Sequence, residues 1–186
     1  MAITKQVLLK QKKILSFFTY CYMYAQNKSK INAKGDLLMN TKIRGFETVT
    51  GKEDTRLPIR STEYSAGYDF FAREDIKILP HNLKIAWTGI KAYMQPDEVL
   101  KLYNRSSMAT KKGLMLSDNV AVIDADYYNN PTNEGEIGFM FYNFTSEIAI
   151  IKKGEKLGQG LFEKYLKADN DVHGGKRISG FGSTGL

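Results

Sequence analysis

Short runs of alternating apolar and polar residues make up most of the chain from residue 41 onward. The run over residues 83–94 shows the alternation best, and it stops at Gln95 and Pro96. A period of two is typical of a strand with one buried face. Shorter runs predict further strands, over residues 66–72, 76–78, 99–103, 120–124, 136–143, 147–152 and 157–162. Strands this short, bounded by turn residues, favour an all-β sandwich or barrel.

Two segments depart from this strand pattern. Residues 106–112 have the pattern of a helical turn, and Gly113 directly after them is a typical helix-ending residue. Beyond Lys167 the sequence becomes polar and rich in glycine. We therefore expect one short helix within the β domain and a flexible C-terminal arm over residues 166–186.

The composition supports one folded domain. The chain has 186 residues, of which 42% are hydrophobic, enough for one domain with a real core. Its apolar runs are all shorter than the roughly 18 residues of a membrane span. The single cysteine, Cys21, excludes an internal disulfide, and the sequence has no CxxC or Cys/His cluster for zinc. His81 and His173 have no partners at a recognisable spacing, so we expect both on the surface.

The positive charge is unevenly distributed along the chain. The whole chain carries +7, which would suggest a nucleic-acid partner. Residues 1–38 hold seven lysines and one acid (7 − 1 = +6), whereas residues 39–186 hold 20 basic and 19 acidic residues (20 − 19 = +1). The larger segment is nearly neutral and has no basic stripe to follow a phosphate backbone. We therefore expect no nucleic-acid polymer as a partner.

The first 38 residues are open to three interpretations. Basic residues 10–13 precede an apolar stretch over residues 14–25, which is the order found in a secretory signal. A basic amphipathic helix on a membrane surface is the second interpretation. We favour the third, an N-terminal extension that is poorly ordered or that lies upstream of a true start at Met39. The functional domain is then expected over residues 39–186.

Two segments carry polar groups that a β-barrel does not need for folding. Asp69 lies in the apolar run 66–72, where a carboxylate must be paired or functional, a strand-end acid being the simpler alternative. Arg105, Ser106 and Ser107 stand at the start of the predicted helical turn and offer several donors to an anion. A serine N-cap beside a surface arginine is the competing interpretation.

Two further segments could carry chemistry. The apolar run over residues 120–123 ends at Asp124, a candidate general base, and Tyr127 follows as a candidate stacking platform. A strand end with tyrosines in the core is the alternative. Near the C-terminus, glycines and hydroxyl side chains surround Arg177 and Phe181, a combination suited to close contact with a ligand. A frayed tail would have a similar composition.

Taken together and in order, five segments resemble the five motifs of the homotrimeric dUTPase family. These segments are residues 66–69, 104–109, 122–127, 154–159 and 180–185. The resemblance covers residues 39–186. It implies a distorted, jelly-roll-like β-barrel that assembles as a homotrimer with shared active sites. It also implies Mg²⁺-dependent, cytoplasmic hydrolysis of dUTP to dUMP and pyrophosphate, which removes dUTP and supplies dUMP for dTMP synthesis.

The resemblance also implies roles for individual residues. Asp124 would activate the water that attacks the α-phosphorus, and Asp69 would lie near Mg²⁺ and act through water. Mg²⁺ itself would be held mainly by the phosphates and water. The residues implied to bind the phosphates are Arg105, Ser106, Ser107, Gln159, Arg177, Gly182, Ser183 and Thr184. Those implied to contact uracil or deoxyribose are Asp118, Asn119, Tyr127 and Phe181.

The sequence departs from the family pattern at several positions. Ser107, Ala121 and Asn129 stand where the family usually has glycine. Asp118 stands where the family often has an asparagine that reads uracil, with Asn119 beside it, so the mode of base reading stays open. In the fifth motif, Lys176 is an alternative to Arg177 as the clamp on the γ-phosphate. Residues 130–133 look like a short insertion after the third motif.

Two rival functions remain at this stage. A dCTP deaminase of the same superfamily is favoured by the Arg105-Ser106-Ser107 sequence, but Tyr127 and residues 181–185 look like dUTPase. The second rival is a nucleotide-switched regulatory protein, for which the insertion at residues 130–133 would offer a docking site.

Overall fold

The computed structural model describes residues 30–31, 37–38 and 42–172. The chain divides into two compact units, residues 1–42 and 43–186. In the first unit, β1 (Lys30–Ile31) pairs antiparallel with β2 (Leu37–Leu38). Most of the N-terminal extension, to which the leader interpretations apply, lies outside the described residues. No helix of the described segments is long and apolar enough to cross a membrane.

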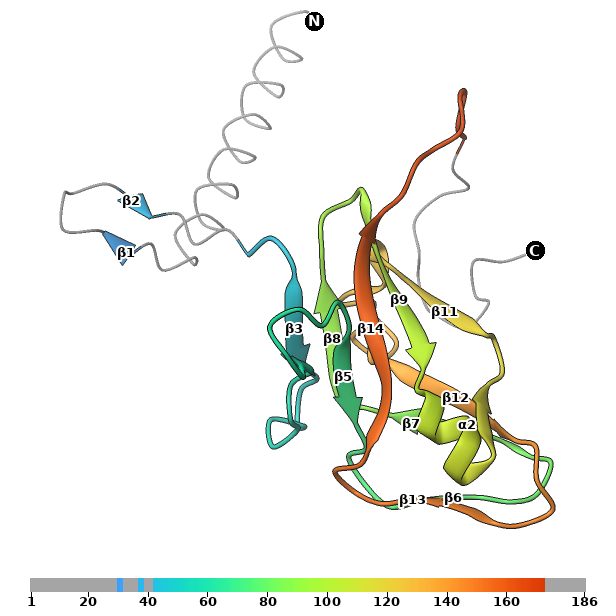
Figure 1. The fold of residues 1–186 in the computed structure, drawn as a ribbon. Helices are drawn as coiled ribbons and strands as arrows, with labels where there is room; N and C mark the ends of the chain where they lie inside the picture. The colour runs from blue at the N-terminus through green and yellow to red at the C-terminus, as the bar shows by residue number, and fades with distance from the viewer. Residues whose placement is uncertain (1–29, 32–36, 39–41, 173–186) are drawn as a thin grey trace, which may run out of the picture. The chain divides into compact units, whose positions relative to one another are not determined.

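The second unit is built of short antiparallel strands with one α-helix and one 3-10 helix in its described part (Figure 1). One sheet has five strands in the order β11-β9-β14-β5-β4, another has three in the order β10-β12-β7, and β13-β6 and β3-β8 form pairs. The elements are β3 (Gly45–Thr48), β4 (Ile59–Arg60), β5 (Tyr68–Phe71), β6 (Ile76–Ile78), β7 (Leu83–Trp87), β8 (Ile90–Tyr93), β9 (Glu98–Asn104), α2 (Ser106–Lys112), β10 (Leu114–Leu116), β11 (Val120–Asp124), η1 (Ala125–Tyr127), β12 (Gly138–Asn143), β13 (Ala149–Ile151) and β14 (Lys156–Lys164).

The core lies between the five-stranded and three-stranded sheets. Phe70 on β5 and Leu100 on β9 are fully buried, as is Phe139 on β12. The rings of Phe70 and Phe139 have centroids 5.4 Å apart, so side chains of the two sheets meet directly. Each such large apolar side chain contributes about 1.5–3 kcal/mol when it is fully buried. The mostly β architecture with one short helix confirms the fold class predicted from the alternation.

The predicted single strand over residues 83–94 is wrong, because the structure divides it in two. β7 pairs with β12, whereas β8 pairs with β3 in a different sheet. Gly89 separates them with φ at 73°, and a Cβ there would lie 2.7 Å from Thr55 Oγ1. The alternation continues across this break, so the pattern itself contains no sign of the change of sheet.

Helix α2 confirms the predicted helical turn and its end. Gly113 has φ at 63° and its N–H donates to the carbonyl of Ala109, which closes the helix. Arg105 is the N-cap residue and makes no side-chain capping hydrogen bond. Ser106 and Ser107 are therefore the first two helical residues, and the alternative of a serine N-cap is wrong.

Candidate active site

Strand register brings three of the family-like segments together at one end of the five-stranded sheet. Asp69 on β5 lies opposite Gln159 on β14, and Gln159 lies opposite Tyr103 on β9. Directly opposed residues share a face of a sheet, so these side chains form one row. Two residues after Tyr103 the chain reaches Arg105 and the start of α2.

Asp69 is the electrostatic centre of this row. It is only 7% exposed, it accepts hydrogen bonds from Lys156 Nζ at 2.7 Å and from the Ser61 hydroxyl, and Arg105 Nε lies 3.6 Å away. Burial on its own raises the pKa of Asp69, but the hydrogen bonds from Lys156 and Ser61 and the nearby Arg105 charge outweigh burial and lower the pKa. Asp69 is therefore held as a carboxylate between two cations. We call Asp69, Arg105, Lys156 and Gln159 the charged cluster.

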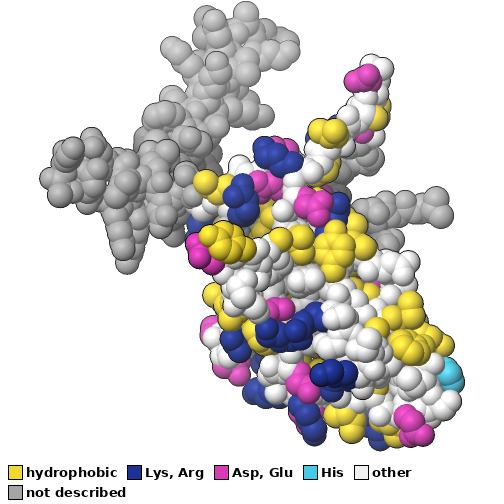
Figure 2. Space-filling model, in the orientation of Figure 1, with side chains coloured by type: hydrophobic (Ala, Val, Ile, Leu, Met, Phe, Trp, Pro, Cys, Tyr) yellow, Lys and Arg dark blue, Asp and Glu magenta, His cyan; other side chains and the backbone are white. Residues whose placement is uncertain are grey.

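Sequence reasoning gave no role to Lys156 or Ser61. Lys156 lies within the fourth family-like segment, but only the structure shows that β14 is irregular between Lys156 and Gln159, so the lysine reaches Asp69. Ser61 follows β4, a strand of two residues that no alternation could have indicated. In the space-filling view, Lys and Arg side chains gather over this region of β14, β5 and α2 (Figure 2).

The Gln159 side chain packs against a backbone that has no side chain of its own. A Cβ on Gly67 would lie 2.5 Å from Gln159 Oε1. Glycine at this position therefore allows the amide to lie beside Asp69 in the row. Ser106 is exposed and Ser107 is half-buried, and both belong to the first turn of α2, where backbone N–H groups lack helical acceptors.

Asp124 lies at the other end of the same sheet. It is the last residue of β11, opposite Val99 on β9, and it is the N-cap residue of η1. Its side chain shares a face of β11 with Val120 and Val122, which are 36% and 56% exposed. The predicted apolar strand therefore has one half-buried face, with Ala121 and Ile123 against the core, and one exposed face within a single chain.

Tyr127 is a buried side chain with both hydrogen-bonding directions of its hydroxyl used. It is 5% exposed, its O–H donates to the carbonyl of Glu136 at 2.8 Å, and it accepts from Asn133 Nδ2 at 2.8 Å. Within a single chain Tyr127 is therefore buried, as the alternative of a tyrosine in the core predicted.

One chain does not bring Asp124 to the charged cluster. From Asp69 to Asp124 the path crosses three inter-strand steps, β5 to β14 to β9 to β11, and four residues along β9, which is about 20 Å at ordinary strand spacings. This distance is further than a triphosphate reaches. Asp118 and Asn119 form the turn that leads into β11, with φ of Asn119 at 55°, so they lie at the end of β11 nearer the charged cluster.

Five predicted site residues lie outside the described residues and have no observed position. They are Arg177, Phe181, Gly182, Ser183 and Thr184. Lys176, the alternative to Arg177, lies outside them as well.

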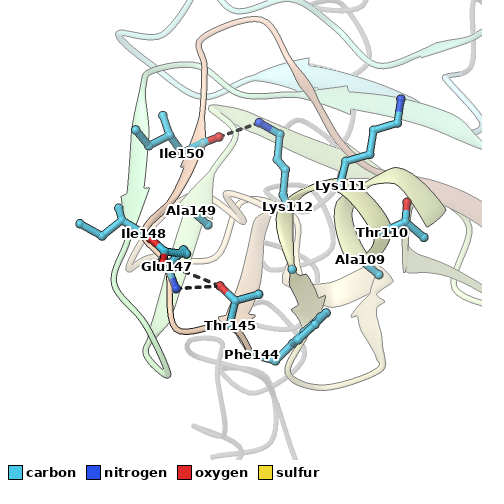
Figure 3. Close-up of a pocket in the computed structure, with 11 residues that line it drawn as sticks. Ala109, Thr110, Lys111, Lys112, Phe144, Thr145, Glu147, Ile148, Ala149 and Ile150 are labelled. Atoms are coloured by element: carbon cyan, nitrogen blue, oxygen red, sulfur yellow. Dashed lines mark hydrogen bonds between the residues drawn. The ribbon is translucent and has the colours of Figure 1, made fainter.

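A surface groove elsewhere in the molecule contains none of the predicted site residues. It has a volume of about 500 Å³ and lies between α2 and residues 144–150 (Figure 3). Lys112 Nζ donates to the carbonyl of Ile150 at 2.6 Å across it. Because Asp69, Gln159 and Asp124 do not line this groove, we do not place the active site there.

Comparison with known proteins agrees with the fold and with the motifs. Residues 53–185 match the dUTPase family model. A deoxyuridine 5'-triphosphate nucleotidohydrolase of Lactococcus lactis subsp. lactis (strain IL1403) is 52% identical over 148 residues, covering 77% of this chain and 99% of the relative. A protein of the same name from Hydrogenobaculum sp. (strain Y04AAS1) is 31% identical, covering 73% and 94%.

Solved structures give the same result. The crystal structure of dUTPase from Streptococcus mutans aligns with a TM-score of 0.64 and 44% identity, covering 68% of this chain and 99% of that one. A dUTPase from phage phi11 of S. aureus aligns with a TM-score of 0.58 and 20% identity, covering 75% and 98%, and this likeness concerns the fold alone. The fold and the ordered motifs thus define a nucleotide hydrolase of the dUTPase type.

The chain belongs to the dUTPase family. It is a dUTP diphosphatase, an enzyme of nucleotide metabolism that hydrolyses dUTP to dUMP and pyrophosphate. The family uses Mg²⁺.

Proposed function

We propose that Asp124 is the general base of dUTP hydrolysis and that the charged cluster, with Ser106 and Ser107, holds the phosphates. The observation that carries this proposal is the row formed by Asp69, Gln159 and the start of α2, which joins three family-like segments in one polar site. Asp124 accepts a proton from water as the water oxygen bonds to the α-phosphorus. The bond from that phosphorus to the bridging oxygen breaks, and pyrophosphate leaves with the electron pair.

The charged cluster is suited to phosphate because its cations are already in place. Arg105 presents a planar donor fork to phosphate oxygens, and the first N–H groups of α2 add further donors. Asp69 holds Arg105 and Lys156 close together. Gln159 contributes an amide that Gly67 leaves room for.

The distance of about 20 Å between Asp69 and Asp124 supports an active site shared between copies of the chain. We propose a homotrimer in which Asp124 and Tyr127 of one copy face the charged cluster of another. Val122, 56% exposed beside Asp124, supports this arrangement because a neighbouring copy would cover it. The outward face of the three-stranded sheet is apolar as well, with Met115, Leu83 and Trp87 between 38% and 57% exposed.

The chemistry of the site fits an Mg²⁺ ion that is carried mainly by the substrate. In residues 42–172 and the two short segments before them, no group of three or more His, Cys, Asp or Glu side chains could hold a metal. Mg²⁺ retains several waters and commonly binds nucleotide phosphates, where it neutralises their charge. Asp69 is already paired with Lys156, so we assign it a contribution through water only.

For the C-terminal arm we propose the roles that the motif resemblance implies. Arg177 would clamp the γ-phosphate, Phe181 would cover the uracil, and Gly182, Ser183 and Thr184 would wrap the phosphates. Truncation after Lys176 should then remove hydrolysis and leave the trimer intact, as measured by pyrophosphate release and light scattering. Arg177→Ala should cost more activity than Lys176→Ala, and the reverse order would make Lys176 the clamp.

Base and sugar contacts complete the proposal. Tyr127 would pack under the deoxyribose, where a ribose 2′-hydroxyl would clash. Asp118 and Asn119, in the turn that leads into β11, would read the uracil edge. We place the reaction in the cytoplasm, where it removes dUTP and supplies dUMP.

Pyrophosphate release measured with dUTP, dTTP, dCTP and UTP tests the substrate assignment directly. We expect dUTP to be the preferred substrate. Release of ammonia from dCTP would instead support the deaminase alternative.

A further inference from the structure

The loop after η1 is built around Tyr127. Residues 130–133 look like an insertion in the sequence; the side chains of Asn130 and Asn133 turn toward Tyr127, whereas Pro131 and Thr132 are exposed. Asn130 is 5% exposed, and its Nδ2 donates to the carbonyl of Tyr127 at 2.9 Å and to Asn133 Oδ1 at 2.8 Å. Its Oδ1 accepts from the backbone N–H of Thr132 at 3.1 Å. Every hydrogen-bonding direction of the Asn130 amide is thus used to close the loop on Tyr127.

Asn133 continues this network to the phenol. Its Oδ1 also accepts from the backbone N–H of Gly135 at 3.1 Å, and its Nδ2 donates to the Tyr127 hydroxyl at 2.8 Å. That hydroxyl in turn donates to the carbonyl of Glu136 at 2.8 Å. The tyrosine is therefore held at its backbone by Asn130 and at its hydroxyl by Asn133 and Glu136.

The backbone of the loop adds steric constraint. A Cβ on Gly135, at φ 82°, would lie 2.4 Å from the carbonyl oxygen of Tyr127. Asn129, which stands where the family usually has glycine, has φ at 55°, a conformation that asparagine tolerates better than most residues. The backbone at Gly135 thus packs directly against the backbone of Tyr127.

We propose that Asn133 and Asn130 are positioning residues that set the preference of the enzyme for deoxyribose over ribose by immobilising Tyr127. The inference rests on the proposed role of Tyr127 beneath the sugar. A pocket whose side chains can shift to accommodate one added hydroxyl discriminates only weakly against it. Steric exclusion of a 2′-hydroxyl requires a rigid contact surface. Tightly packed, hydrogen-bonded side chains provide such a surface.

The test compares kcat/KM for dUTP and UTP in Asn133→Ala and Asn133→Asp. Aspartate keeps the acceptor that bonds Asn130 and Gly135 but has no N–H to donate to the phenol. In both variants we expect the dUTP to UTP preference to fall about tenfold, the size of one lost hydrogen bond, mainly because UTP turnover rises. Thr132→Val is the matched control: it removes one hydroxyl hydrogen bond to Asn130 Oδ1, which keeps its bonds from the backbone N–H groups of Thr132 and Asn133, so the preference should not change.

Tyr127→Phe keeps the ring but removes both hydroxyl bonds, and it should lower the preference at least as much as Asn133→Ala. On the Tyr127→Phe background, Asn133→Ala should have no further effect on the preference, because Asn133 acts through its hydrogen bond to the Tyr127 hydroxyl, which Tyr127→Phe has already removed. An unchanged preference in both Asn133 variants, or an undiminished effect of Asn133→Ala on the Tyr127→Phe background, would overturn the inference. Tyr127→Ala distinguishes the proposed sugar contact of Tyr127 from the proposed positioning role of Asn130 and Asn133. If the dUTP to UTP preference of Tyr127→Ala were unchanged, Tyr127 would not contact the sugar, and that part of the proposed function would be wrong.

Discussion

The two ends of the five-stranded sheet hold their functional side chains by different chemistry. At the Asp69 end, ionised groups face one another, with Lys156 at 2.7 Å and Arg105 at 3.6 Å from the carboxylate. At the Tyr127 end, neutral amides and carbonyls hold the phenol at 2.8 Å on two sides. Long cationic side chains can exchange one anion for another, whereas an amide network in a tight loop has a single satisfied arrangement.

This difference matches what each end has to recognise. A triphosphate enters and pyrophosphate leaves, so the Asp69 end must bind anions whose charge changes during the reaction. The sugar keeps one shape throughout, so the Tyr127 end benefits from rigidity. Changes within the charged cluster should therefore affect all nucleotides alike, and changes at Tyr127 should affect the choice between deoxyribose and ribose.

The largest effect is expected at Asp124. Asp124→Asn removes the proposed base and should lower kcat at least about 10³-fold, while dUTP binding measured by calorimetry persists. Asp97→Asn is the matched control, because Asp97 is an exposed acid paired with Lys164 outside the proposed site. Near wild-type pyrophosphate release by Asp124→Asn would rule out the base.

Arg105→Ala should have the next largest effect. Loss of a charged hydrogen-bond donor to phosphate should lower kcat/KM about 10–100-fold, and for dUTP and UTP equally. Arg105→Lys keeps the charge but lacks the planar guanidinium, so its kcat/KM should lie between those of the wild type and Arg105→Ala. If Arg105→Ala changed the dUTP to UTP preference as Asn133→Ala does, the division of labour between the two ends would be wrong.

The two ends should also differ in the pH dependence of stability. The folded-state pKa of Asp69 is lowered, so its contribution to the free energy of unfolding is present above its unfolded-state pKa of about 3.9 and is lost as pH falls through the folded-state value. Lys156→Gln should cost about 1–2 kcal/mol at pH 7 and less at pH 3, measured by urea unfolding at fixed protein concentration. Asn133→Ala should show the same deficit at both pH values, because no charged group holds Tyr127 through it. If the loss of unfolding free energy depended on pH equally in the two variants, the contrast between charged contacts at Asp69 and neutral contacts at Tyr127 would be wrong.

Gly67→Ala should have the smallest effect. The new Cβ would lie 2.5 Å from Gln159 Oε1 and 3.1 Å from Gln159 Cβ; rotation of the amide relieves the first contact, and a shift of a few tenths of an ångström the second. Gln159 can rotate away, so we expect kcat/KM for dUTP to drop a few-fold while the free energy of unfolding changes by less than about 1 kcal/mol. A larger loss of stability with normal kinetics would mean that Gly67 serves folding and not the position of Gln159.

Much of the fold and part of the site could be predicted from the sequence. The alternation predicted short strands, and Gly113 predicted the end of the helix, because both signals are local. The break at Gly89 was missed because the alternation continues through it while the partner strand changes. The motif resemblance predicted Asp69, Arg105, Gln159 and Asp124 as site residues, and the structure brings the first three of them together.

The sequence could not predict which residues far apart along the chain contact one another. The bond from Lys156 to Asp69 depends on an irregularity in β14 that leaves no local signature. The contact from Asn133 to Tyr127 depends on how an apparent insertion folds back, and the sequence assigned Asn133 no contact to Tyr127. Both are hydrogen bonds between segments whose approach is set by the backbone.

The central claim is that one active site combines the Tyr127 end of one copy with the Asp69 end of another. It is tested most directly by refolding Asp124→Asn and Arg105→Ala chains together in equal amounts. Asp124→Asn alone is expected to be nearly inactive, and Arg105→Ala alone to keep about 1–10% of the wild-type rate. With random assembly about one quarter of the shared sites would receive an intact Asp124 from one chain and an intact Arg105 from its neighbour. We predict pyrophosphate release from dUTP at about a quarter of the wild-type rate. A rate no higher than the sum of the separate variants would show that each site is built within a single chain.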